Sequence, residues 1–465
     1  MPMNIADRLR RVEGSTVLTG REEIIPYMRD ASYFSGKLPD AVIIPGSTRE
    51  VSEMMSICNE MKVQVTTRGG GSSLTGSSVP ISGGVVISMA RMNGIIETKP
   101  SDSYVVAEPG VRLDDLNREL RKIGFFYPPD PASSMAATVG GTISTNAGGL
   151  RAATYGTTKE WILGLEVVLP TGEVIETGGR TLKRSKGYDL TALMAGSEGT
   201  LGIITKAILK IWPLPEATGR IMAYFREIAP AGRAIAELKT RGIVPYIAEF
   251  MDRISLESIR AAKGLEFPVE AQYLLLVDIA STVESVDRVL DRTAGIVRTF
   301  DPISIITTRN SDEMEKMYEA RKGLYSSSLS QRNSPDEYVV IGDVVVPASG
   351  LPDTLEGIRE AAKRFSLKVI LFGHIGDGNV HANIFADLSR EDVRNNVDGF
   401  QMSIAGIALD HGGSVSAEHG IGLEKKDLLR LEFDQRGSSY SMDLMRKIKT
   451  AFDPNGILNR GKIFD

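Results

Sequence analysis

The chain has 465 residues, enough for two or three domains with substantial cores. It is 42% hydrophobic and 24% charged, no apolar run approaches the ~18 residues of a membrane-spanning helix, and the first residues lack the apolar core of a signal peptide. A net charge of −5 without a basic tract argues against a nucleic-acid partner. We therefore expect a cytoplasmic protein, and peripheral contact with a membrane stays open.

A short strand is predicted at residues 41–44, followed by a helix that Ser47 and Glu50 begin as a capping box. The single cysteine, Cys58, lies on the apolar stripe of this helix, which favours a buried structural thiol. One cysteine excludes an internal disulfide and an all-cysteine iron–sulfur cluster.

The next predicted strand, at 63–67, leads into a glycine-rich loop at residues 68–76. Consecutive glycines allow positive φ and let successive N–H groups converge on an anion, so a pyrophosphate would fit there. The loop lacks the sequence of a P-loop and the spacing of a Rossmann turn. Taken alone, it is equally well interpreted as a flexible surface loop.

Two further glycine-rich segments favour a binding function. Residues 140–149 read Gly-Gly-Thr-Ile-Ser-Thr-Asn-Ala-Gly-Gly, and residues 196–202 read Gly-Ser-Glu-Gly-Thr-Leu-Gly before a predicted strand at 203–211. Three such segments predict backbone packed closely along one long ligand. Pro213 and Pro215 then mark a domain boundary.

After a predicted strand at 272–278, residues 311–329 predict a helix whose apolar stripe includes Arg321. Two interpretations stay open. The stem of the arginine can pack in the core while its head meets a nearby carboxylate. Alternatively, its planar guanidinium binds the carboxylate of a small acid through two parallel hydrogen bonds.

All four histidines lie between residues 374 and 419. Residues 368–372 and 380–385 predict a hairpin around a turn at 376–379, so that His374 and His381 face each other. Opposite residues have Cβ atoms ~4.5–5.5 Å apart, which allows both imidazoles to bind one metal ion. Asn383, two residues on, shares that face.

A carboxylate is available to complete the metal site. Glu418 supplies a third ligand with His419 beside it, and two histidines plus a carboxylate form a common divalent-metal set with open positions. A His-x6-His pair alone would be interpreted as surface residues of a hairpin. The added Glu-His and the lack of histidine elsewhere favour a metal. His411, before two glycines, is interpreted as a helix cap.

These motifs resemble a known family. Arg-Gly-Gly-Gly-Ser-Ser, the Asn-Ala-Gly-Gly array and Ser-Glu-Gly-Thr-Leu-Gly-Ile-Ile-Thr resemble, in that order, the FAD-binding domain of the vanillyl-alcohol oxidase family. Gly-His-x-Gly-Asp-Gly-Asn-x-His and Glu-His-Gly-Ile-Gly resemble the C-terminal region of FAD-linked oxidases. The pattern is similar to glycolate oxidase flavin subunits and to D-lactate and D-2-hydroxyglutarate dehydrogenases, over residues 40–465.

The resemblance implies an α+β fold. Residues 1–215 would form a two-subdomain FAD-binding domain of the vanillyl-alcohol oxidase type. Residues 216–415 would form an antiparallel-sheet cap, or substrate, domain. Residues 416–465 would return to the FAD domain as a C-terminal helical segment. The resemblance also suggests a homodimer.

It further implies the residues that contact FAD. The pyrophosphate would lie against Arg68, Gly69, Gly70, Gly71, Ser72, Ser73, Thr75 and Gly76. The flavin or its diphosphate would be lined by Pro131, Ser133, Thr138, Gly141, Ser144, Asn146 and Gly148, the adenosine end by Glu198, Gly199 and Ile204, and the isoalloxazine by Asn459. Family members with covalent FAD often carry a histidine in or near the first loop. This chain has Ser73 there, so we expect non-covalent FAD.

The implied reaction oxidises a D-2-hydroxy acid to a 2-oxo acid. His374, His381 and Glu418 would hold Zn or Mn, which orients the substrate hydroxyl and lowers its pKa. His419 would take the hydroxyl proton and Asn383 would bind a substrate oxygen, while hydride passes to the flavin.

The expected substrate is a monocarboxylate. The resemblance supports Arg321 as the anchor for the substrate carboxylate. A lysine that the 2-hydroxyglutarate branch would carry near Ile341 is absent, so D-lactate or glycolate is favoured over D-2-hydroxyglutarate.

Other functions and the electron acceptor stay open. A flavoprotein of the same fold, such as an alkyl-dihydroxyacetone-phosphate synthase, is one alternative. A metal-dependent hydrolase without flavin, or a nonenzymatic nucleotide-binding module, is another, and neither would absorb visible light. Because the chain cannot hold an iron–sulfur cluster with cysteines alone, the acceptor is external: an iron–sulfur subunit, an electron-transfer flavoprotein, a quinone or oxygen.

Overall fold

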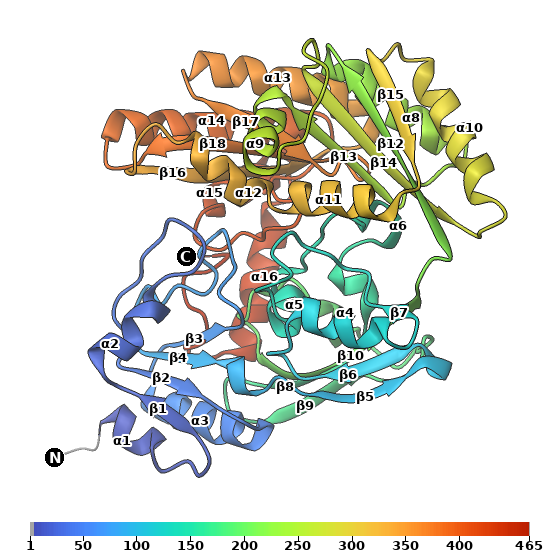
Figure 1. The fold of residues 1–465 in the computed structure, drawn as a ribbon. Helices are drawn as coiled ribbons and strands as arrows, with labels where there is room; N and C mark the ends of the chain where they lie inside the picture. The colour runs from blue at the N-terminus through green and yellow to red at the C-terminus, as the bar shows by residue number, and fades with distance from the viewer. Residues whose placement is uncertain (1–3, 465) are drawn as a thin grey trace. The chain divides into compact units, whose positions relative to one another are not determined.

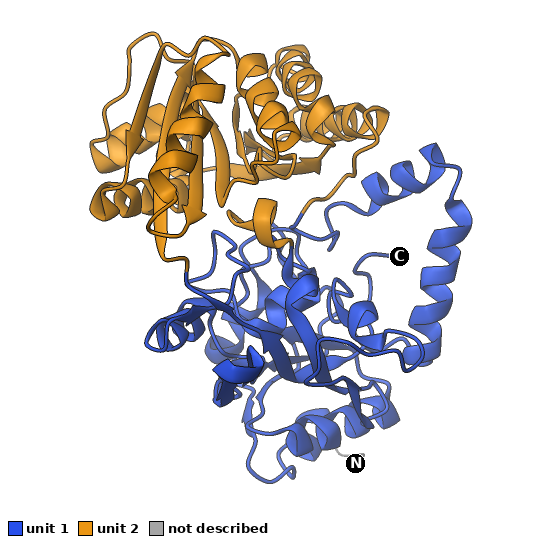
Figure 2. Cartoon of the chain, turned by 90° about the vertical axis from the view of Figure 1, so that its right-hand side faces the viewer, with its two compact units in different colours: residues 1–148, 157–214, 418–465 blue, residues 149–156, 215–417 orange. Residues whose placement is uncertain are grey.

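The computed structural model describes residues 4–464. The chain divides into two compact units, coloured separately in Figure 2. Unit 1 comprises residues 1–148, 157–214 and 418–465, and unit 2 comprises residues 149–156 and 215–417. In the described part of the chain, we find no helix with the length and apolar character needed to cross a bilayer.

Unit 1 begins with a four-stranded sheet in the order β1-β2-β4-β3, in which β2, β4 and β3 run parallel. Its elements are α1 (Ile5–Leu9), β1 (Thr16–Leu18), α2 (Arg21–Ile24), β2 (Ala41–Ile44), α3 (Thr48–Met61), β3 (Val65–Arg68) and β4 (Val85–Ser88). The predicted cap at Ser47 is confirmed, since its side chain accepts from the Glu50 N–H, but the Glu50 carboxylate accepts from the Gly46 N–H instead of closing the capping box on Ser47. Cys58 is buried on α3, and this burial raises the pKa of its thiol to about 12.

A second, antiparallel sheet of unit 1 has the order β5-β6-β10-β8-β9. Its strands are β5 (Ile95–Lys99), β6 (Tyr104–Ala107), β8 (Ile162–Val168), β9 (Val174–Gly178) and β10 (Ile203–Lys210). Around it lie α4 (Leu113–Arg121), α5 (Val139–Thr145), α7 (Leu190–Met194) and the small pair β7 (Phe125–Phe126) and β11 (Trp212–Pro213).

The C-terminal segment is part of the core of unit 1. After α15 (Lys426–Gln435) and α16 (Ser439–Phe452), Leu458 forms a β-bridge to Val65, and the Asn459 N–H donates to the Val65 carbonyl at 2.8 Å. Leu458 and Ile457 are buried in the same apolar cluster as Cys58. The end of the chain therefore extends the first sheet beside the glycine-rich loop.

Unit 2 contains a seven-stranded antiparallel sheet in the order β15-β12-β14-β13-β17-β18-β16 (Figure 1). The strands are β12 (Ala217–Phe225), β13 (Ile247–Asp252), β14 (Tyr273–Ser281), β15 (Ser304–Thr308), β16 (Glu337–Val345), β17 (Val369–Gly373) and β18 (Asn379–Asp387). The helices are α6 (Ala152–Tyr155), α8 (Ile228–Thr240), α9 (Arg253–Lys263), α10 (Val286–Arg298), α11 (Ser311–Lys322), α12 (Leu324–Ser328), α13 (Leu351–Arg364) and α14 (Glu391–Asp410).

Two details of unit 2 differ from the sequence expectation. The helix predicted at 311–329 is interrupted at Gly323, which separates α11 from α12. In the predicted hairpin, the residue opposite His381 is Phe372 rather than His374. Since β17 ends at Gly373, His374 lies just beyond the strand, two residues further along the same face.

Candidate flavin and metal sites

The loop after β3 has the backbone geometry of an anion site. Gly71 has φ +67° and Gly76 has φ +80°. The consecutive N–H groups of residues 70–73 donate to no acceptor within residues 4–464. Four unused donors in a glycine-rich turn suit a diphosphate, so this loop fits the cofactor that the sequence implies.

The first two glycine-rich segments lie side by side in unit 1. A Cβ at Gly70 would collide with the carbonyl oxygen of Ala136, and one at Gly69 would collide with the hydroxyl of Thr138. Thr138 is the N-cap of α5 and accepts from the Gly141 N–H at 3.4 Å. Close approach of the two segments therefore explains why these positions are glycine.

The third glycine-rich segment meets the C-terminal return. The Asn459 side chain donates to the Glu198 carbonyl at 2.5 Å and accepts from the Thr67 N–H at 3.3 Å. The Glu198 carboxylate accepts from the N–H groups of Ile421 and Gly422 at 2.6 and 2.9 Å. Burial raises the pKa of Glu198, and these donors oppose that rise.

Several predicted FAD residues have local structural partners. Asn146 has φ +52° and its side-chain oxygen accepts from the Lys159 N–H at 2.9 Å, while the Ser144 hydroxyl donates to the Gly140 carbonyl. Ile204 is buried on β10 and Gly199 has φ +67°. Pro131 is buried, whereas Ser133 is exposed and its carbonyl accepts from two following N–H groups.

The loop that carries His419 runs along the first glycine-rich loop of unit 1. The Thr75 hydroxyl donates to the His419 carbonyl at 3.3 Å, and the Leu423 N–H donates to the Thr75 carbonyl at 2.8 Å. A Cβ at Gly148 would lie 2.9 Å from a carboxylate oxygen of Glu418. Glu418 and His419 therefore lie beside the segments expected to bind the flavin.

On unit 2, the β17–β18 hairpin places two imidazoles together. The ring centroids of His374 and His381 are 5.3 Å apart and nearly perpendicular, and both side chains are buried. The Phe372 ring lies 5.3 Å from His381. The carbonyl of His374 accepts the N–H groups of residues 377–379, so the turn itself fixes the backbone at this histidine.

The backbone just before Glu418 is bound to Asp343, which pairs with His381 in the β16–β18 ladder. The N–H of the preceding Ala417 donates to the Asp343 carboxylate at 3.1 Å, which fixes the backbone one residue before Glu418. One ligand atom from each of His374, His381 and Glu418 lies within 4.8 Å of the others. Two imidazoles and a carboxylate at this spacing fit a divalent cation such as Zn or Mn.

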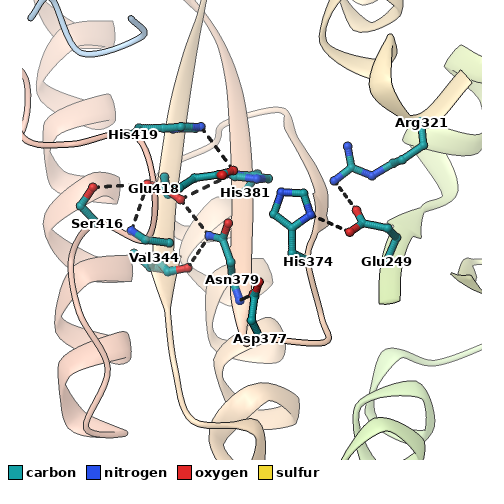
Figure 3. Close-up of polar contacts among 12 residues, drawn as sticks. Glu249, Arg321, Val344, His374, Asp377, Asn379, His381, Ser416, Glu418 and His419 are labelled. Carbon is teal, nitrogen blue, oxygen red and sulfur yellow. Dashed lines mark hydrogen bonds and ion pairs between the residues drawn. The ribbon is translucent and has the colours of Figure 1, made fainter. Parts of the chain in front are cut away.

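Arg321 and His374 share one buried carboxylate (Figure 3). Glu249 on β13 has an oxygen 2.6 Å from His374 Nδ1 and its other oxygen 2.6 Å from Arg321 Nη2. The guanidinium of Arg321 thus meets a protein carboxylate, as the structural interpretation of this residue expects. The interpretation as an anchor for a substrate carboxylate depends on which of its N–H groups stay available. The Nη2 contact is not aligned as a hydrogen bond, and Nη2 and Nε have no acceptor within residues 4–464.

Asn383 is the other buried group with unused polar atoms. Its side chain is 0% exposed, and neither its amide nitrogen nor its oxygen has a partner among the described residues. It shares the face of β18 with His381 and lies opposite Ile341 of β16. An uncompensated buried amide is costly, and such groups are found where a ligand supplies the missing partner.

Sequence reasoning did not identify two buried acids of this region. Asp343 accepts from the Asn379 amide at 2.8 Å and lies 3.6 Å from His381 Nδ1, and Glu249 contacts His374. The sequence gives only a weak indication of these two acids, because each acid lies among mostly apolar residues of a strand. Glu249 lies in Ile-Ala-Glu-Phe-Met-Asp and Asp343 lies in Val-Ile-Gly-Asp-Val-Val. His411 is the C-cap of α14, as expected.

Comparisons with known proteins agree with this architecture. The family model described as FAD linked oxidases, C-terminal domain, matches residues 214–463, and the model described as FAD binding domain matches residues 39–178. The fold is the two-subdomain FAD-binding type of the vanillyl-alcohol oxidase family, with an antiparallel-sheet cap. The chain belongs to the FAD-linked oxidases and is an FAD-dependent oxidoreductase.

Curated relatives match along most of their length. "Glycolate oxidase subunit GlcD" of Bacillus subtilis (strain 168) is 36% identical over 438 residues, which is 94% of this chain and 92% of the relative. "D-lactate dehydrogenase" of Anaerostipes hadrus is 32% identical, covering 98% of this chain and 96% of the relative.

Solved structures share the fold at low identity. A p-cresol methylhydroxylase with substrate bound has a TM-score of 0.80 at 19% identity, covering 99% of this chain and 96% of its own. An alkyldihydroxyacetonephosphate synthase has a TM-score of 0.76 at 18% identity, and the match covers 99% of this chain and 85% of the synthase chain.

Proposed function

We propose that this protein oxidises a 2-hydroxy acid to the 2-oxo acid with non-covalent FAD and a divalent metal, with D-lactate or glycolate as the favoured substrate. The observation that carries the proposal is the spacing of His374, His381 and Glu418, whose ligand atoms lie within 4.8 Å of one another. Relatives named glycolate oxidase subunit and D-lactate dehydrogenase support the substrate class.

His374, His381 and Glu418 would hold the divalent cation, which would supply the Lewis acidity that lowers the pKa of a bound hydroxyl. The glycine-rich loops of unit 1 would hold FAD, which would supply the hydride-accepting chemistry.

The residues of the chain bind and orient the acid. Arg321 is buried and keeps N–H donors without an acceptor, so its guanidinium would bind the substrate carboxylate. The unpaired amide of Asn383 would bind a second substrate oxygen. His419 would take the hydroxyl proton, the general-base role that histidine fills most often.

Ile341 favours a small monocarboxylate. It lies opposite Asn383 in the β16–β18 pair and is buried, so it adds an apolar surface beside the proposed substrate amide. A second carboxylate, as in D-2-hydroxyglutarate, would be left without a cation at this position, which is unfavourable for a buried charge.

Electrons would leave the protein to an external acceptor. Cys58 is buried in the core of unit 1, and a single thiol cannot hold an iron–sulfur cluster. We propose an iron–sulfur subunit, an electron-transfer flavoprotein or a quinone as the acceptor, and a cytoplasmic location that allows contact with a membrane surface.

An anaerobic substrate panel tests the proposed function. Purified protein should be yellow, and D-lactate or glycolate should bleach the flavin, while the opposite enantiomer of lactate and D-2-hydroxyglutarate should bleach it more slowly. His381→Ala should keep the colour and lose bleaching. Bleaching at an unchanged rate in this variant would remove the metal from the mechanism, and a colourless protein would favour the hydrolase alternative.

A further inference from the structure

Glu249 is completely buried on β13 and touches two groups that the proposed function uses. One carboxylate oxygen is 2.6 Å from His374 Nδ1, and the other is 2.6 Å from Arg321 Nη2. Three ionisable side chains from β13, the end of β17 and α11 therefore meet in one contact (Figure 3). This contact lies wholly within unit 2.

We propose that Glu249 is a positioning residue that prepares His374 for metal binding and holds Arg321 for the substrate carboxylate. The inference rests on the proposed function, because it assigns a role within that same site. It adds a residue that neither the motifs nor the metal-ligand pattern identifies.

The hydrogen bond to His374 fixes which ring nitrogen faces the metal. A carboxylate that carries its charge can only accept, so this contact would assign the proton to Nδ1 and leave the lone pair of Nε2 for the metal. A carboxylate behind a metal-binding imidazole also raises the basicity of the ligand, and loss of such a partner costs 10–100-fold in metal affinity in typical sites.

The strand pairing makes this contact rigid. Phe250, the neighbour of Glu249, pairs with Gly373, the neighbour of His374, and the Ala248 carbonyl accepts from the Gly376 N–H at 3.1 Å. Both sides of the Glu249–His374 contact are thus held by backbone hydrogen bonds. A side-chain contact on paired strands needs no rearrangement when the metal binds.

The contact with Arg321 has a different character. The two atoms are close enough for a strong ion pair, but the N–H is not aligned on the carboxylate oxygen. Glu249 therefore neutralises the buried charge while leaving N–H groups available to another acceptor. The Arg321 guanidinium also lies 4.8 Å over the Phe372 ring, which limits where the head can move.

The two roles can be separated by zinc affinity and substrate kinetics. We would measure zinc binding by competition with a chromophoric chelator, using the FAD-loaded protein. Glu249→Gln should weaken zinc binding by roughly 10–100-fold, because the amide provides a weaker acceptor for the Nδ1 proton. Arg321→Lys keeps the charge beside Glu249, so zinc binding should stay within about threefold while KM for the 2-hydroxy acid rises.

Asp252→Asn is the matched control. Asp252 is also buried on β13, but its carboxylate accepts from the N–H groups of Ser255 and Leu371 and touches neither His374 nor Arg321. Its variant should bind zinc as tightly as the wild type does. Equal loss of zinc affinity in Asp252→Asn and Glu249→Gln would overturn the proposal, because a general loss of stability would then explain both.

A second variant guards against misfolding. Replacing both partners together, Glu249→Leu with Arg321→Met, removes the ion pair without leaving a charge unpaired, which is often tolerated. The double variant should retain FAD and still lose zinc affinity. If either Glu249 variant bound zinc as tightly as the unmodified protein, only the role of Glu249 would be overturned. If the unmodified protein neither bound zinc nor was bleached by 2-hydroxy acids, the proposed function itself would be overturned.

Discussion

The side chain of Asn383 is 0% exposed, and neither of its polar atoms has a partner within residues 4–464. Asn379 lies four residues earlier on the same face of β18 and is also buried. In contrast, its amide donates to Asp343 at 2.8 Å and to the Val344 carbonyl at 3.0 Å. One strand therefore carries two buried asparagines, one satisfied by the fold and one not.

Asn383→Leu should therefore make the protein more stable and less active. Removing an unsatisfied buried amide relieves a cost of ~1–3 kcal/mol. Loss of a hydrogen bond to the reacting substrate should lower kcat by roughly 10²–10³-fold. Thermal unfolding and anaerobic flavin bleaching measure the two effects.

Asn379→Leu gives the opposite stability result, because it leaves the Asp343 carboxylate without its amide donor. We expect its unfolding temperature to fall. If both variants lost stability to the same degree, the amide of Asn383 would have a structural role and would not be reserved for substrate.

The C-terminal return carries a buried lysine. Lys462 is 2% exposed, its Nζ donates to the Val79 carbonyl at 2.6 Å, and burial lowers the pKa of the ammonium to about 8 from its ordinary value of 10.5. Neighbouring Asp30 and Glu198 oppose this shift without cancelling it. Burial of the protonated Lys462 ammonium therefore lowers the stability of the folded protein.

The stability of unit 1 should rise with pH between the two pKa values. In the range from about 8 to 10.5, the unfolded chain binds a proton that the folded chain does not, so raising the pH favours folding. Lys462→Met should remove this contribution and be relatively more stable below pH 8. Unfolding temperatures of both proteins measured across this range provide the check, and parallel pH profiles would contradict the lowered pKa.

At the scale of single elements, the sequence predicts what is local. The helix cap at Ser47 and the strand β2 follow from adjacent residues, and the structure confirms them. The hairpin was predicted with His374 opposite His381, but the residue opposite His381 is Phe372. The strand β17 ends at Gly373, and three N–H groups of the turn donate to the carbonyl of His374. A turn that begins on the histidine itself cannot be read from glycine spacing.

The long-range contacts are the part that the sequence does not provide. Gly323 interrupts the helix although the apolar period continues through it to Leu324. Glu249 and His374 are 125 residues apart and meet only because β13 pairs with β17. A single acid in an apolar strand indicates that a buried partner exists, but it does not identify the partner.

For the whole molecule, the proposed non-covalent binding of FAD predicts a stability that depends on cofactor concentration. A ligand that binds only the folded protein at 100 times its Kd adds about 2.7 kcal/mol. The unfolding temperature should therefore rise as FAD is added to the stripped protein. Acid precipitation should also leave all the flavin in the supernatant, because Ser73 offers no histidine for covalent attachment. A yellow pellet would contradict this prediction.

The division of the chain into units also orders events during synthesis. Unit 2 is complete once residue 417 has left the ribosome, whereas unit 1 needs residues 418–465 before Leu458 can reach Val65. The N-terminal sheet is therefore synthesised more than three hundred residues before the segment that pairs with its β3 edge at Val65. A chain cut between residues 418 and 457 would contain every residue of unit 2 but would lack the segment that pairs with Val65 in unit 1.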